Sequence, residues 1–141
     1  MFMDTCVHFA GDTAGLRSWL AKQGVPEMPA EPRRSFLGDR RGKVYDTSEE
    51  NTRLALVSAD DGSCSAYAEF ADREQLARNL EGALHEANDN FTAQGEHADA
   101  RDPTLARRDY RATIGTRQWL VLVTTTQAQG KLQAALTLRP Q

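Results

Sequence analysis

Apolar and polar residues follow the period of a helix between residues 73 and 87. The apolar side chains of this segment are Leu76, Ala77, Leu80, Ala83, Leu84 and Ala87. This spacing places them on one face of a helix. Asp72 and Gln75 stand at the two positions of a capping box, in which each side chain satisfies a backbone N–H at the helix start. We therefore expect a helix over residues 73–87 that packs its narrow apolar face on a sheet.

A second helical period occurs near the N-terminus. Its apolar stripe consists of Leu16, Trp19 and Leu20. Asp12 or Thr13 can cap its start, and Gly24 followed by Pro26 is typical of a helix end. These residues predict a helix over 13–23.

The segments on either side of this helix carry weaker patterns. Residues 2–9 are short and mixed, which fits either an edge strand or a simple anchor for the terminus. Residues 25–42 contain three prolines and no period. We expect an ordered connection across the surface there, with room for a short helical turn at 36–42.

The rest of the chain alternates between apolar and polar residues, as strands do. We expect strands over residues 42–46, 53–58, 64–70, 107–114, 117–126 and 131–138. Asp60 to Ser63 includes an Asp-Gly pair and predicts a hairpin turn. Residues 119–123 are apolar on both faces and predict a central strand. Residues 91–106 are polar and irregular, so we expect a long loop.

The expected order is αβββαβββ, with an N-terminal helix and a central helix. Apart from the helical crossover, every link between strands has the length of a hairpin, which favours a mainly antiparallel sheet. The sequence therefore predicts an α+β fold with one sheet of five to six strands. The layout is similar to profilin-like or PAS-like domains. A length of 141 residues suits a single domain over 1–141.

Composition narrows the classes of partner. Apolar residues make up 40% of the chain and charged residues 26%, as in ordinary globular proteins. The net charge of −3 is too small to indicate a polyanionic partner for the whole molecule. No apolar run reaches the length of a membrane span.

Cys6 and Cys64 are the two cysteines of the chain. One lies near the N-terminus and the other at the start of an expected strand, so a disulfide would tie the terminal segment to the sheet. The N-terminus shows no signal peptide, but the mature form of an exported protein would begin in this way. We expect a disulfide and a periplasmic location. The alternative is two buried thiols in a cytoplasmic protein.

Catalytic and metal-binding signals are weak. The chain lacks the common nucleophile-elbow, phosphate-loop, dinucleotide and zinc-protease motifs. His85 with Glu81, and His97 with Glu96, could meet at a metal, but a solvated helix flank and a loop histidine explain them better. Cys64 has no feature that would activate it as a nucleophile. We therefore expect no metal, no cofactor and no enzymatic activity.

Two arginine clusters are candidate contacts for a partner. The residues that we assign to partner binding are Arg40, Arg41, Arg101, Arg107, Arg108 and Tyr110. Arginine and aromatic residues dominate the energetics of protein interfaces. Acidic residues such as Asp39 and Asp109 interleave with them, so solvated charged edges are the simpler interpretation, and a protein partner with an acidic surface fits the clusters as well as nucleic acid does. We expect a protein partner and no nucleic acid. We regard Trp119 as a core residue.

The residues Cys6, Leu16-Arg-Ser-Trp19-Leu20 and Gly62-Ser-Cys64, followed by the long helix, form a loose pattern over the first two thirds of the chain. This pattern resembles small exported bacterial proteins of uncharacterised function. The resemblance implies a location in the periplasm or envelope and supplies no catalytic residue.

Three functions follow as hypotheses. The first is a non-enzymatic envelope binding protein, most concretely an immunity protein or inhibitor that neutralises a secreted toxin or enzyme. The second is a sensor or carrier with a small-ligand pocket between the central helix and the sheet, where the alanine-rich stripe leaves room. The third is an unfamiliar hydrolase that uses His85, His97 or Cys64.

Overall fold

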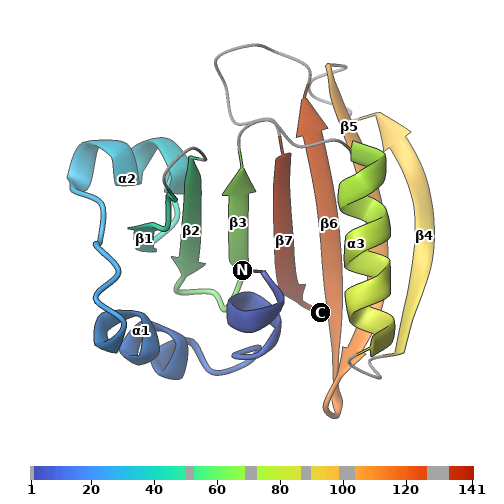
Figure 1. Ribbon diagram of the computed structural model, residues 1–141, viewed down its shortest axis with the longest axis horizontal. Helices are drawn as coiled ribbons and strands as arrows, with labels where there is room; N and C mark the ends of the chain where they lie inside the picture. Colours follow the sequence, from blue (N-terminus) through green and yellow to red (C-terminus); the bar gives the residue numbers. More distant parts are fainter. Residues whose placement is uncertain (1, 50–52, 69–72, 87–89, 99–103, 127–133) are drawn as a thin grey trace.

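One antiparallel sheet organises the chain (Figure 1). The computed structural model describes residues 2–49, 53–68, 73–86, 90–98, 104–126 and 134–141. The helices are η1, a short π-helix (Met3–Val7), α1 (Thr13–Lys22), α2 (Ala30–Leu37) and α3 (Arg73–Glu86). The strands are β1 (Gly42–Asp46), β2 (Leu54–Ala59), β3 (Cys64–Ala68), β4 (Asn90–Ala98), β5 (Leu105–Ile114), β6 (Arg117–Thr126) and β7 (Ala134–Pro140). The seven strands lie in the order β1-β2-β3-β7-β6-β5-β4.

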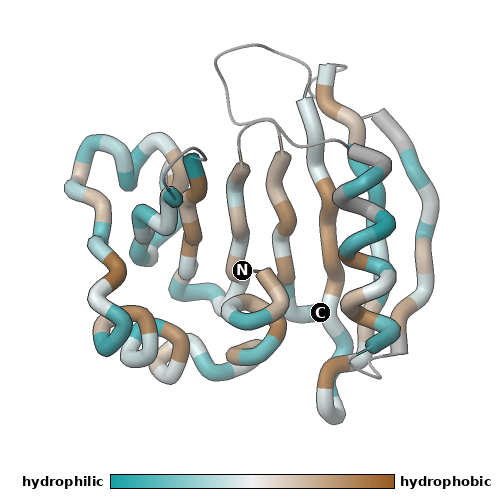
Figure 2. Tube along the Cα trace, in the orientation of Figure 1, coloured by the Kyte–Doolittle hydropathy of each residue, from teal (hydrophilic) through white to brown (hydrophobic). Residues whose placement is uncertain are grey.

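The main core lies on the inner face of the sheet, which η1, α1 and α3 cover. Leu56 pairs with Ala66, Ala66 with Leu136, and Leu136 with Val123, so these four side chains share this face. They belong to one apolar cluster with residues from the three helices: Cys6, Val7, Leu16, Leu20, Leu80 and Leu84. Figure 2 shows hydrophobic stretches along β6 and β7 in the middle of the sheet. Burial of these apolar stripes is the main force that fixes the helices on the sheet.

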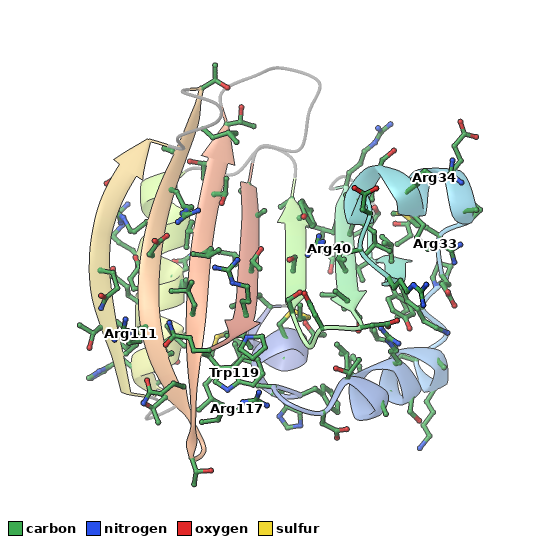
Figure 3. All side chains as sticks on the ribbon, turned by 180° about the vertical axis from the view of Figure 1, so that it is seen from behind. Arg33, Arg34, Arg40, Arg111, Arg117 and Trp119 are labelled. Carbon is green, nitrogen blue, oxygen red and sulfur yellow. A yellow bond between two sulfur atoms is a disulfide. The ribbon has the colours of Figure 1, made fainter. Side chains whose placement is uncertain are left out.

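The opposite face is covered only in part. Leu37 on α2 packs with Val44, Val57 and Ala59 in a second, smaller cluster over β1 and β2. Seen from behind, no helix lies over β4, β5, β6 and β7 (Figure 3). We call this uncovered surface the open face. Its described residues include Thr92, Arg107, Asp109, Arg111, Thr113, Gln118, Leu120, Leu122, Thr124, Ala135, Thr137 and Arg139.

Two features fasten the N-terminal segment to the sheet. Cys6 and Cys64 form the expected disulfide, with their Cα atoms 5.4 Å apart. Arg17 of α1 donates hydrogen bonds from Nη2 to the Ser58 carbonyl (2.8 Å) and to Oδ1 of Asp60 (2.7 Å). The disulfide therefore anchors η1 to β3, while the arginine anchors α1 to the end of β2.

Most local predictions are confirmed. All six strand pairs are antiparallel. The Asp12 side chain caps α1 by accepting from the Gly15 N–H at 2.9 Å. Gly24 and Gly62 take positive φ angles of 72° and 92° at the expected helix end and hairpin turn. Trp119 is buried on β6, between β7 and β5. The predicted cap Asp72 lies outside the described residues.

The prediction of five to six strands is wrong, because the polar segment after α3 contains strand β4. Phe91 and Ala93 pair with inward-facing residues of β5, and a bulge follows between Ala93 and Gly95. The strand lies at the edge of the sheet, where polar residues are common. Its composition therefore resembled that of a loop.

The N-terminal part also contains more helix than expected. Residues 2–9 contain the turn η1 rather than an edge strand, which agrees with their alternative role as an anchor. The proline-rich connection contains α2, with Pro29 at its N-cap and Pro32 in the first turn. Proline is tolerated there because the first N–H groups of a helix have no intrahelical partner. None of the described helices is long and apolar enough to cross a membrane.

Candidate partner-binding surface

The structure separates the arginines that were predicted to act together. Arg40 and Arg41 follow α2 and are exposed. Arg40 donates to the carbonyl oxygens of Phe36 and Leu37, at 3.4 and 3.3 Å. Arg107 lies on the open face, whereas Arg108 lies on the inner face, because neighbours in a strand point to opposite sides. Arg101 lies outside the described residues.

Tyr110 is not available as a surface anchor, since its exposed fraction is 0%. Its hydroxyl donates to Oε1 of Glu81 on α3 at 2.7 Å. Arg108 lies against the same hydroxyl and donates from Nη2 to Oε2 of Glu96 at 2.9 Å. The burial of Tyr110 corrects its assignment to a partner surface, whereas the assignment of Arg108, whose side chain is 21% exposed, stays a prediction. These contacts hold α3 and β4 on β5.

The contacts within this cluster raise the pKa values of both Tyr110 and Arg108. Burial, followed by the hydrogen bond to Glu81, raises the pKa of Tyr110 to about 12. The hydrogen bond to Glu96 raises the pKa of Arg108. Tyr110 is therefore a neutral donor over the whole physiological range, and Arg108 is a permanent cation. This arrangement suits a structural contact.

The open face carries residues that the sequence analysis did not group. Arg111 on β5 pairs with Leu120 on β6, and Leu120 pairs with Arg139 on β7. One row across three strands thus contains an arginine, a leucine and an arginine. Strand alternation combined with the correct pairing would have revealed this row, but the pairing depends on contacts far apart in the sequence.

The next row across the same strands contains Asp109, Leu122 and Thr137, and its polar side chains form hydrogen bonds within the protein. Leu122 is only 8% exposed, although no described helix covers it. Arg107 donates from Nε to Oδ1 of Asp109 on the same strand at 3.0 Å. Across the sheet, the hydroxyl oxygens of Ser65 and Thr137 are 2.9 Å apart. The open face therefore combines small hydroxyl and aliphatic side chains with arginines.

The catalytic and metal alternatives gain no support from the contacts. Within the described parts of the chain, no group of three or more His, Cys, Asp or Glu side chains could hold a metal ion. Glu81 and Glu96 are already engaged by Tyr110 and Arg108. Cys64 is oxidised in the disulfide and is not a free thiol. The hypothesis of a ligand pocket concerns the space between α3 and the sheet, and there Leu80 and Leu84 are buried in the main core.

Comparisons with models of known protein families, with curated proteins and with solved structures found no match. The resemblance to small exported bacterial proteins and the profilin-like or PAS-like layout therefore stay predictions.

Proposed function

We propose that this chain is a non-enzymatic binding protein of the bacterial envelope. In its most concrete form it is an immunity protein or inhibitor that neutralises a secreted toxin or enzyme. The observation that carries the proposal is the open face of β4 to β7, which no described helix covers and which presents arginines beside partly buried aliphatic groups. Arginine at such positions contributes strongly to protein interfaces.

The size of the open face supports this proposal. Four strands side by side are about 19 Å across, and strands of ten residues such as β5 and β6 are about 33 Å long. The resulting area of roughly 600 Å² approaches the roughly 800 Å² that each partner contributes to a standard interface. A partner can therefore bind here without any rearrangement of the core.

The disulfide supports the location. Disulfides persist in oxidising compartments such as the bacterial periplasm and are rare in the cytosol. Cys6 and Cys64 are both buried, and their bond attaches η1 to the middle of the sheet. A rigid scaffold of this kind loses little conformational entropy when it binds a partner.

Co-purification followed by an inhibition assay tests the proposal. The tagged protein, exported to the periplasm of its host, is expected to retain one protein partner at a stoichiometric ratio. Addition of the purified chain should then suppress that partner's toxic or enzymatic activity. Retention of no protein, or retention of one whose activity is unchanged, would contradict the proposed function.

A further inference from the structure

We infer that the row Arg111, Leu120 and Arg139 on the open face binds an acidic protein surface in which two carboxylates flank an aliphatic side chain. This inference rests on the proposed function and identifies the chemistry of the partner. We call the three residues the arginine row.

The geometry of the row comes from the strand pairing. Arg111 and Arg139 lie opposite Leu120 on the two neighbouring strands, so all three side chains project from the same face. Two strand spacings place the arginine backbones about 10 Å apart. Arg111 and Arg139 are exposed, and Leu120 is half-buried between them. A partner can therefore contact the leucine while each guanidinium receives a carboxylate.

The two arginines are free to accept such a ligand. Among the described residues, neither Arg111 nor Arg139 forms a side-chain hydrogen bond or an ion pair. Arg107, two rows away on β5, differs because it is paired with Asp109. Asp61 lies near Arg139 and Arg40, but it already accepts hydrogen bonds from the backbone and hydroxyl of Ser63. Surface arginines without an internal partner favour recognition of an external anion.

The charge distribution favours an acidic partner. Among the described residues, the charged side chains on the open face are Arg107, Asp109, Arg111 and Arg139, which sum to +2. Subtraction of this value from the full chain's net charge of −3 leaves −5 for all its other residues together. Arg40 and Asp61, at the border, cancel each other. A basic face on an otherwise acidic molecule orients an acidic partner toward that face during encounter.

A protein carboxylate fits this face better than a nucleic acid does. Binding of single strands needs aromatic side chains on which bases stack, close to the basic groups. Among the described residues, β4 to β7 present no aromatic side chain on the open face. Tyr67 lies on the adjacent β3 and packs edge-on against Phe36, with ring centroids 5.2 Å apart. The threonines and leucines of the face suit a protein surface.

An NMR titration of the full, disulfide-bonded chain tests the inference. Poly-L-glutamate serves as the probe, and oligothymidylate at the same charge concentration serves as the comparison. Poly-L-glutamate is expected to shift the amide resonances of Arg111, Leu120 and Arg139. The double variant R111Q/R139Q should raise the Kd by about fivefold or more, as expected for the loss of two exposed ion pairs.

The control removes the same charge from another place. Arg33 and Arg34 lie on α2, away from the arginine row (Figure 3). R33Q/R34Q should change the Kd by less than about twofold, since these residues are outside the contact. Equal losses in the two double variants, no binding of poly-L-glutamate, or tighter binding of oligothymidylate on the same row would each overturn the inference.

The two proposals fail in different ways. If no partner protein is retained by the wild-type chain, the proposed function fails. If a partner is retained and R111Q/R139Q binds it as tightly as the wild type does, only the arginine row is wrong. Circular dichroism and urea unfolding of both double variants establish that each is folded before its affinity is compared.

Discussion

Tyr110 combines complete burial with a hydrogen bond to a charged side chain. Its hydroxyl connects β5 to Glu81 of α3 inside the main core. Tyr110→Phe removes this donor and leaves Glu81 without it, so we expect the free energy of unfolding to fall by about 1.5–2 kcal/mol. Urea unfolding measures the change. Tyr67→Phe is the matched control, because its ring contact with Phe36 does not need the hydroxyl, and it should change stability by less than about 0.5 kcal/mol.

The same phenol predicts how stability depends on pH. Its pKa is about 12 in the folded chain, above the ordinary value of 10.0. The protonated form is therefore favoured by folding, and its contribution is complete below pH 10 and is lost as the pH rises toward 12. The stability advantage of the wild type over Tyr110→Phe should shrink by about 1–2 kcal/mol across this range, after allowance for solvent screening. Urea unfolding of both proteins at pH 9 and at pH 11.5 measures it, and a constant advantage would contradict the assignment.

Single residues also show how much of the candidate site the sequence could reveal. Arg107 and Arg108 are adjacent in a strand, so alternation alone requires them to face opposite sides. Their opposite orientation was therefore predictable from the sequence, and the assignment of both arginines to one surface did not take it into account. Which of the two sides is open could not be predicted, because it depends on where α3 packs after the chain crosses from β3 to β4.

At the scale of elements, the sequence predicted helix caps, turns and apolar strands correctly where residues close in sequence determine them. The cap at Asp12, the turn at Gly62 and the apolar run in β6 were all read correctly, because each depends on neighbours in sequence. Strand β4 was missed because pairing with β5 stabilises it despite a polar composition. The helix α2 was missed because Pro29 and Pro32 suggested a loop, although the start of a helix accommodates both.

Two glycines in regular elements lead to opposite predictions. Gly82 lies in α3, and a Cβ added there would meet nothing within 4 Å, so Gly82→Ala should raise the free energy of unfolding by about 0.5–1 kcal/mol through helix propensity. Gly42 lies in β1, where an added Cβ would come within 2.7 Å of the Ala59 Cα and closer still to the Ser58 carbonyl oxygen. Gly42→Ala should therefore lower stability by about 1–3 kcal/mol. Thermal and urea unfolding measure whether each variant is more or less stable than the wild type. A Gly42→Ala protein as stable as the wild type would contradict the close approach of β1 to β2 at this position.

At the scale of the whole molecule, the pairing of β3 with β7 joins the N-terminal and C-terminal halves of the sheet. The first three strands precede α3, and the other four follow it. Cys64 lies at this junction, where it pairs with Leu138 of the last strand while its sulfur is bonded to Cys6. The disulfide therefore connects the first turn of the chain to the strand at which the two halves meet.

Removal of this disulfide should reduce stability more than any single substitution above. The two cysteines are 58 residues apart, and the chain-entropy model gives a loss of about 4 kcal/mol for a loop of that length. Urea unfolding with and without reductant measures the loss, and the double variant C6S/C64S should be as unstable as the reduced wild type and insensitive to reductant. Thiol titration of the unreduced, denatured protein should detect no free sulfhydryl. Two reactive sulfhydryls in protein taken directly from its host would contradict both the disulfide and the oxidising compartment that we infer from it. An oxidising compartment keeps a buried pair such as Cys6 and Cys64 bonded, so reduced cysteines would mean that the protein resides in a reducing one.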